Sequence, residues 1–227
     1  MLNLRKEIER LKKGRRAFRF YRQCVPKGSL CFDIGANHGS RAVIFSLLGA
    51  RTVALEPNAD LTRKLRHFPR VVVLNQAVSD QPGQQTMFFN RNDQISSLNP
   101  EWRKQWPDFP DWVERSVECV TLDQLIAQHG LPHFCKIDVE GYEATALAGL
   151  TQRIPLISFE ATPHFRENAE KCLGHLARIG EYEFNFAVGD DFEWISSWVN
   201  ADQILALIQQ PGDIYARLKS PSTGRPA

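Results

Sequence analysis

The chain has 227 residues, which is enough for one well-buried core and short for two, so we expect a single domain with modest additions. A formal net charge of +2 is far from the strongly basic balance that would itself indicate a nucleic-acid partner. The five cysteines are odd in number and form no C-x-x-C pair, so we interpret them as reduced thiols of a cytoplasmic protein. No apolar run approaches the ~18 residues of a membrane span, and the first 22 residues lack the apolar block of a secretory signal.

The first 22 residues contain nine Lys or Arg and two acidic residues. Leu4, Ile8, Leu11 and Phe18 fall on one helical face, which predicts a basic amphipathic helix within residues 1–25. We favour a solvated helix packed on the edge of the domain over a surface for peripheral membrane contact or for nucleic acid. The basic residues are expected to lie away from the reacting edge, and they lack the interleaved aromatic residues with which proteins bind single-stranded nucleic acid.

From Pro26 onward, short apolar strands alternate with amphipathic stretches, a pattern typical of a parallel sheet covered by helices. The predicted strands are 30–34, 52–56, 71–75, 134–138 and 155–160, and the predicted helices are 40–48, 60–67, 122–129, 143–150 and 165–179. Two further strands, 183–188 and 192–196, are predicted to form an antiparallel hairpin. The fold expected is therefore a doubly wound α/β domain over residues 26–210 with a mostly parallel seven-stranded sheet. The remainder, residues 211–227, is rich in Pro, Ser and Gly and is predicted to be a flexible tail.

Residues 91–115 interrupt the alternation. Trp102, Trp106 and Trp112 lie here among three prolines, and neither a helical nor a strand period persists. A long irregular loop is usually functional or disordered, and three tryptophans argue against disorder. We interpret the block as a lid or substrate wall, with a purely structural aromatic plug as the alternative.

The segment "CFDIGANHGS" from Cys31 to Ser40 combines the end of a strand, a glycine-containing turn and a helix start, at the edge where open α/β sheets bind ligands. A dinucleotide turn needs a second glycine for the pyrophosphate, and here Asn37 takes that position. S-adenosylmethionine has no phosphate and needs only a close backbone approach with polar groups for its ammonium and carboxylate. The residues of this turn predicted to bind it are Asp33, Gly35, Ala36, Asn37 and Gly39.

Glu56 ends the next strand, 23 positions after Asp33 (56 − 33), close to the ~20-residue spacing at which an acid meets a ribose. Its carboxylate can accept hydrogen bonds from both ribose hydroxyls and would repel a 2′-phosphate, which disfavours NADP. We include Pro57, which follows it, in the cofactor site.

The next strand exit, "NQAVSD", begins at Asn75. We predict that adenine lies against Ala77 and Val78, with Gln76 near its edge. The alternative is an ordinary exit from a strand into the turn at Pro82 and Gly83.

Several motifs occur in order between about Leu30 and Glu160: "FDIGANHG", "ALEPN", "LNQAVSD", Ser-Ser-Leu at Ser96 to Leu98, "VTLDQL" and "KIDVEGYE". Together they resemble the FkbM-type methyltransferases. The resemblance implies a class I methyltransferase fold of the Rossmann-like kind, S-adenosylmethionine as cofactor, and typically O-methylation of sugar or natural-product hydroxyls. It explains neither the basic N-terminal helix nor the tryptophan block.

An alcohol is a poor nucleophile until a base takes its proton, so the site needs a base or a metal ion near the methyl group. The segment "KIDVEGYE" supplies Asp138, Glu140 and Glu143 where a buried strand ends. Alternation puts Asp138 and Glu140 on the same side, and we predict that this pair is catalytic, with Asp138 also at the cofactor. Glu143 begins a helix, where an acid complements the helix dipole, so we leave it out.

Glu160 and His164 follow the next strand and are further catalytic candidates. An imidazole here can serve as base or metal ligand, although a lone loop histidine is more often a solvated surface group. Carboxylates and imidazole suit a hard divalent ion, so Asp138, Glu160 and His164 are candidates for Mg²⁺ or Mn²⁺, and the sequence leaves the metal open.

Two other functions compete with O-methylation of a small-molecule or glycan hydroxyl. One is methylation of RNA or protein, suggested by the basic N-terminal helix. The other is a non-catalytic cofactor-binding module. Retention of Glu56, Asp138 and Glu140 argues against the second, because a binding module has no need of acids at the reacting edge.

Overall fold

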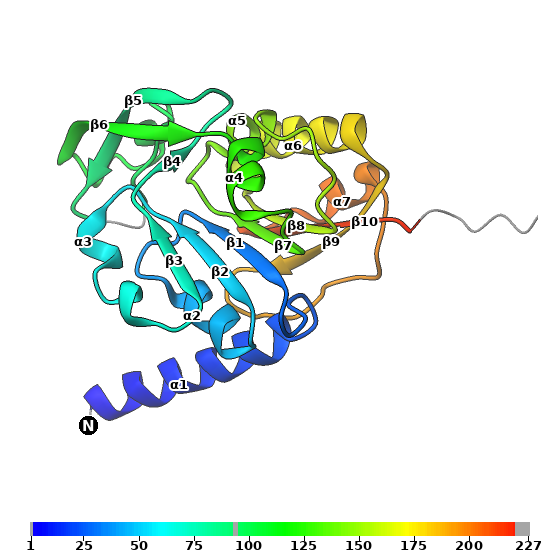
Figure 1. The fold of residues 1–227 in the computed structure, drawn as a ribbon, viewed down its shortest axis with the longest axis horizontal. Helices are drawn as coiled ribbons and strands as arrows, with labels where there is room; N and C mark the ends of the chain where they lie inside the picture. The colour runs from blue at the N-terminus through cyan, green and yellow to red at the C-terminus, as the bar shows by residue number, and fades with distance from the viewer. Residues whose placement is uncertain (1, 93–94, 221–227) are drawn as a thin grey trace, which may run out of the picture.

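The main sheet of the computed structural model has seven strands in the order β3-β2-β1-β7-β8-β10-β9 (Figure 1). The structure describes residues 2–92 and 95–220, with the backbone alone for residues 2–10. The strands are β1 (Leu30–Ile34), β2 (Arg51–Leu55), β3 (Val71–Leu74), β7 (Phe134–Ile137), β8 (Leu156–Ala161), β9 (Tyr182–Val188) and β10 (Gly212–Leu218). The first five pair in parallel. This arrangement confirms the predicted mostly parallel, seven-stranded sheet.

The antiparallel hairpin at the end of the chain is present, but its second strand differs from the predicted one. β9 pairs with β10, not with residues 192–196, which form no strand. β10 also pairs antiparallel with β8 and so is an internal strand. The prediction of a flexible tail is therefore wrong for Gly212–Leu218.

The helices cover both faces of this sheet. They are α1 (Leu2–Tyr21), α2 (Ser40–Leu47), α3 (Ala59–Thr62), α4 (Leu122–His129), α5 (Glu143–Ala148), α6 (Arg166–Ile179) and α7 (Ala201–Leu207), with 3₁₀ turns η1 (Leu65–His67), η3 (Trp102–Gln105) and η4 (Pro163–Phe165). The predicted helix over 60–67 divides into α3 and η1. Helix α4 begins at a capping box in which Thr121 and Gln124 each bond the other's backbone N–H, which stabilises that end.

Two buried clusters fix these layers. On one face, side chains of α4, α5, α6 and α7 pack against the sheet. On the other face, Ala17, Phe20 and Tyr21 of α1 pack with Ile44 and Phe45 of α2. Figure 1 shows α1 and α2 on one side of the sheet and α4 to α6 on the other.

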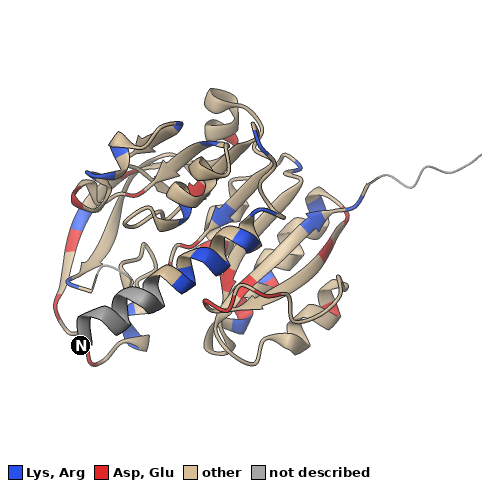
Figure 2. Ribbon diagram, turned by 90° about the horizontal axis from the view of Figure 1, so that it is seen from below, with Lys and Arg blue, Asp and Glu red and all other residues tan. Residues whose placement is uncertain are grey.

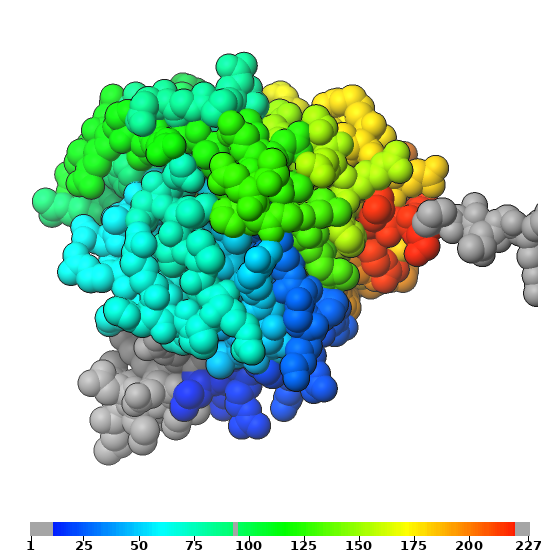
Figure 3. Space-filling model, viewed as in Figure 1, coloured from blue at the N-terminus to red at the C-terminus, as the bar shows by residue number. Residues whose placement is uncertain are grey.

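A second sheet, β4-β6-β5, is inserted between β3 and α4. Its strands are β4 (Ala77–Val78), β5 (Gly83–Asn90) and β6 (Trp112–Val120). Residues 91–115 are thus not wholly irregular, because they include η3 and the start of β6. The second sheet lies at the top of the molecule and α1 at the bottom in the views of Figures 1 and 3.

Helix α1 packs on the domain through its last turns (Figure 2). Its described basic residues are exposed: Lys12, Lys13, Arg15, Arg16 and Arg19. Within the described part of the chain, no helix is long and apolar enough to cross a membrane. All five cysteines are buried and form no disulfide.

The internal position of β10 gives a stability test. Ile214 is fully buried between Phe159 of β8 and Phe186 of β9. Ile214→Ala should lower the free energy of unfolding by about 2 to 5 kcal/mol, because it removes buried methyl groups and leaves a cavity. Urea denaturation measures this change, with the exposed Lys219→Ala as control. Equal stabilities for the two variants would contradict the internal placement of β10.

Candidate active site

A cavity of about 970 Å³ opens at the carboxyl edge of the main sheet, where the turns after β1, β2, β7 and β8 meet. Apart from Gly39, every predicted cofactor residue lines it: Asp33, Gly35, Ala36, Asn37, Glu56, Pro57, Gln76, Ala77, Val78 and Asp138. The structure therefore places the predicted cofactor residues around one space.

Gly35 brings the β1 turn against the end of β7. Its φ is 76°, in the left-handed region, and a Cβ added there would lie 1.8 Å from the carbonyl oxygen of Asp138. Only glycine fits so close an approach. Gly39 does not line the cavity; its φ is 77°, and an added Cβ would lie 2.6 Å from Leu65, so its place in the motif reflects packing beneath the turn.

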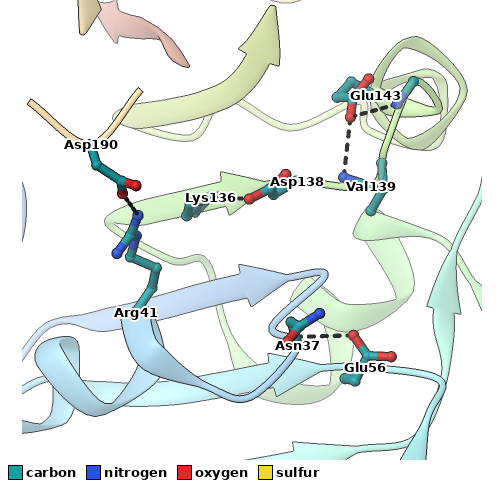
Figure 4. A network of polar contacts seen from close by, with 9 residues as sticks. Asn37, Arg41, Glu56, Lys136, Asp138, Val139, Glu143 and Asp190 are labelled. Atoms are coloured by element: carbon teal, nitrogen blue, oxygen red, sulfur yellow. Dashed lines mark hydrogen bonds and ion pairs between the residues drawn. The ribbon is translucent and has the colours of Figure 1, made fainter. Parts of the chain in front are cut away.

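The Glu56 carboxylate is fixed by two backbone N–H groups. Asn37 donates to Oε2 at 3.0 Å and Asn58 donates to Oε1 at 2.8 Å. Asn37 has a φ of 50°, an uncommon conformation for a residue with a side chain. These contacts couple the β1 turn to the end of β2 (Figure 4).

Three catalytic candidates come together in the cavity. One carboxylate oxygen each of Asp138, Glu140 and Glu160 lies within 4.8 Å of the others. Burial, and then repulsion from Glu160 and Asp138, raises the pKa of Glu140 well above its usual value. Burial and Asp138 likewise raise the pKa of Glu160.

Glu143 holds the turn after β7 that carries Asp138 and Glu140. Its Oε1 accepts hydrogen bonds from the backbone of Val139 at 3.1 Å and Gly141 at 3.2 Å, and Asn168 donates to its Oε2 at 2.6 Å. Glu140 within the turn has a φ of 56°. Glu143 is buried and does not line the cavity, so it positions the turn and does not face the reaction.

Buried charges lie beneath the acids. Lys136 is 2% exposed and donates to Asp138 Oδ2 at 2.6 Å. Asp33 is 1% exposed, and its Oδ2 accepts no hydrogen bond from the described residues. Burial, partly offset by Lys136 and Arg41, raises the pKa of Asp33 to about 6.

A further charged group joins three distant segments. Asp190, after β9, accepts from Arg41 at 3.1 Å and pairs with Lys13 of α1. Lys13 and Arg41 both line the cavity (Figure 4 shows Arg41 and Asp190). The expectation that the basic helix lies away from the reacting edge is therefore wrong for Lys13. Sequence analysis also missed Lys136, Arg41 and Asp190; the i, i+2 spacing of Lys136 and Asp138 on one strand is the signal that could have found the first.

The tryptophan block forms one wall. Trp102 and Trp106 line the cavity, and the indole Nε1 of each is buried with no acceptor among the described residues. The Trp102 ring packs directly against the backbone of Gly141, which allows this contact because an added Cβ would lie 2.6 Å from the ring. Trp112, in contrast, lies in β6 outside the cavity lining.

His164 is not brought to the acids. It lies exposed on η4 and does not line the cavity. The three acids that come together are instead Asp138 and Glu140, which follow β7, and Glu160 near the end of β8. The predicted metal set of Asp138, Glu160 and His164 is therefore not assembled, since Glu140 takes the third place.

Residues 33–186 match the family model described as "Methyltransferase FkbM domain". No curated protein matches the sequence. Among solved structures, the chain is similar to precorrin-6Y C5,15-methyltransferase from Geobacter metallireducens, with a TM-score of 0.46 and 15% identity over 90% of this chain and 87% of that one. It is also similar to a TehB-like SAM-dependent methyltransferase from Corynebacterium glutamicum, with a TM-score of 0.47 and 10% identity over 90% and 88%. Similarities at this level concern the fold alone.

The raised pKa of Asp33 predicts a pH-dependent cost in stability. A carboxyl whose pKa rises from 3.8 to about 6 on folding destabilises the folded state once it is ionised, and this cost disappears as the pH falls below 6 toward 4. Asp33→Asn should therefore raise the free energy of unfolding relative to wild type by about 1 to 3 kcal/mol more at pH 7.5 than at pH 4.5. Urea denaturation of the unliganded protein at both pH values measures this difference. The exposed Asp191→Asn is the control, and parallel pH profiles for Asp33→Asn and wild type would refute the effect.

Proposed function

Since the chain belongs to the FkbM methyltransferase family, we propose that it transfers the methyl group of S-adenosylmethionine to a hydroxyl of a sugar, a glycan or glycolipid, or a natural product. Membership makes it a methyltransferase with S-adenosylmethionine as donor. The acceptor is the part of the proposal that goes beyond membership. The single observation that carries it is the group of Asp138, Glu140 and Glu160 in the same cavity as the cofactor residues.

A hydroxyl acceptor needs these acids more than an amine does. Methyl transfer is an in-line displacement, so rate comes from alignment of oxygen, methyl carbon and sulfur, and from removal of the hydroxyl proton. Lys136 keeps Asp138 paired and oriented. Burial and the neighbouring acids raise the pKa values of Glu140 and Glu160, and a carboxylate with a raised pKa is a stronger base, so both are suited to accept the proton as the C–O bond forms. As the C–O bond forms, the S–CH₃ bond breaks and its electron pair stays on sulfur, so the leaving group is neutral S-adenosylhomocysteine.

The tryptophan wall supports a polyhydroxylated acceptor. The carboxylate of Glu140 and the rings of Trp102 and Trp106 line the same cavity, which gives it an acceptor for hydroxyl hydrogen bonds beside an aromatic surface. The apolar faces of Trp102 and Trp106 suit the C–H surface of a sugar ring or of a natural-product skeleton. Such a surface would be poorly matched to a polyphosphate backbone, which disfavours RNA.

The three carboxylates also have the chemistry of a ligand set for a hard divalent ion such as Mg²⁺ or Mn²⁺. An ion bound there would lower the pKa of the acceptor hydroxyl. The protein residues would hold it and orient the hydroxyl in either case.

Asp138→Asn keeps the shape of the side chain and removes its charge. We expect kcat to fall by roughly 10² or more, because the uncharged amide loses the ion pair with Lys136 and the charge that Asp138 contributes beside Glu140 and Glu160, while the unfolding temperature stays near that of wild type. The assay measures methyl incorporation from S-adenosylmethionine into saccharide, lipid and RNA pools, with exposed Asp202→Asn as control.

Chelator treatment of the wild-type enzyme distinguishes carboxylates that hold a metal ion from carboxylates that act directly on the acceptor. Loss of activity that Mg²⁺ or Mn²⁺ restores supports an ion, and unchanged activity supports direct action of the carboxylates. Near-normal turnover in Asp138→Asn would exclude Asp138 from the chemistry and leave it to Glu140 and Glu160, whereas incorporation confined to RNA would refute the proposed function.

A further inference from the structure

Helix α1 contributes residues to the cavity, although it lies outside the part of the chain that matches the family. Lys13, Gly14 and Ala17 lie in the cavity lining, and Lys13 pairs there with Asp190. The side chain of Lys13 is 47% exposed, and it contributes to the cavity from outside the sheet. The matched family region begins only at residue 33, so α1 lies outside it.

The walls on the two sides of the sheet differ in character. The side toward the second sheet carries Trp102, Trp106 and Glu140, as described above. The side toward α1 and α2 carries Asp33, Arg41 and their charged neighbours. The pairing register places Asp33 of β1 beside Lys136 of β7, so this second side is a row of charges that alternate in sign.

Two atoms on the charged side point to a ligand of mixed charge. Asp33 Oδ2 is fully buried and accepts no hydrogen bond, and Arg41 Nε is buried and donates none, within the described residues. Both residues line the cavity. An unpaired buried acceptor and an unpaired buried donor each cost free energy unless a ligand completes them. A ligand with one ammonium and one carboxylate group completes both.

The order of the strands decides which end of the donor meets this wall. Glu56 at the end of β2 is the residue predicted to bind the ribose, and β1 lies between β2 and β7. A ligand with its ribose at Glu56 therefore extends over Gly35 toward Asp33 and α1. Its amino-acid end is the end that carries an ammonium and a carboxylate.

We propose that α1 is part of the cofactor site, where Lys13 and Arg41 bind the α-carboxylate of S-adenosylmethionine and Asp33 binds its ammonium. Asp190 orients the two cations by pairing with each. The inference rests on the donor that family membership gives and not on the hydroxyl acceptor.

Gly14 follows Lys13 and leaves room at this wall. A Cβ added there meets no atom within 4 Å. A larger side chain at this position would enter the cavity beside Lys13. A Cβ added at Gly174 of α6 also meets no atom within 4 Å, but Gly174 does not line the cavity, so it serves as a matched control position.

The test compares two ligands that differ in the amino-acid end alone. S-adenosylhomocysteine carries the ammonium and carboxylate, whereas 5′-methylthioadenosine lacks both. Calorimetric titration should show that Lys13→Gln lowers the affinity for S-adenosylhomocysteine about fivefold, the size of a charge-assisted hydrogen bond discounted for exposure. The affinity for methylthioadenosine should stay within about twofold of that of the wild type. Lys12→Gln removes the neighbouring exposed charge and should change neither affinity.

Because Lys13 is exposed, its substitution is expected to change the affinity only modestly, and a second pair of variants tests the same wall by blocking it. Gly14→Leu should weaken S-adenosylhomocysteine at least about fivefold relative to Gly174→Leu, because both gain helix propensity and only the first enters the cavity. Unfolding temperatures of all four variants show whether the fold is retained.

The pattern across the two ligands decides the outcome. Selective weakening of S-adenosylhomocysteine by Lys13→Gln and Gly14→Leu supports the proposal. Equal weakening of both ligands, which a merely structural role of α1 would give, overturns it, and so does unchanged binding of both. A wild-type protein that binds neither ligand would overturn the donor assignment with it, whereas failure to methylate a hydroxyl would leave these affinities untouched.

Discussion

The site depends on the close contact between the backbone of Gly35 and the carbonyl oxygen of Asp138. A Cβ at Gly35 would lie 1.8 Å from that oxygen, so no other residue lets the ends of β1 and β7 approach in this way. The contact joins the turn that faces the cofactor to the turn that carries the acids. The rate of methyl transfer depends on the alignment of sulfur, methyl carbon and acceptor, and this contact fixes the spacing of the two turns between which they would meet.

The second constraint is electrostatic. Asp138, Glu140 and Glu160 repel one another in a buried site, and the chain offsets this through Lys136 beneath them and through Glu143, which fixes the turn with backbone hydrogen bonds. Asp33 adds a buried acid with an unpaired oxygen. Burial raises the pKa values of Glu140, Glu160 and Asp33, so the ionised forms of these three acids lower the stability of the unliganded protein, which is characteristic of residues retained for binding and chemistry.

Features set by local sequence were predictable, and features set by distant pairing were not. The strand and turn through Asp33 and the acids after β7 follow from buried runs and from alternation along a strand. Residues Gly212–Leu218 were mistaken for a tail because Pro211 and the charged Asp213 and Arg217 conceal an internal strand. Lys13 and Asp190 are 177 positions apart (190 − 13), and nothing local in the sequence indicates that they meet.

The central claim, that a hydroxyl oxygen receives the methyl group, is tested most directly by the atom to which the transferred carbon becomes bonded. S-adenosylmethionine labelled with ¹³C in its methyl group is incubated with the protein and the pool that takes up label, and the product is examined by carbon NMR. The account predicts a methoxy carbon, coupled through three bonds to a proton on a carbon that bore a hydroxyl. A methyl carbon bonded to nitrogen, sulfur or carbon would contradict it.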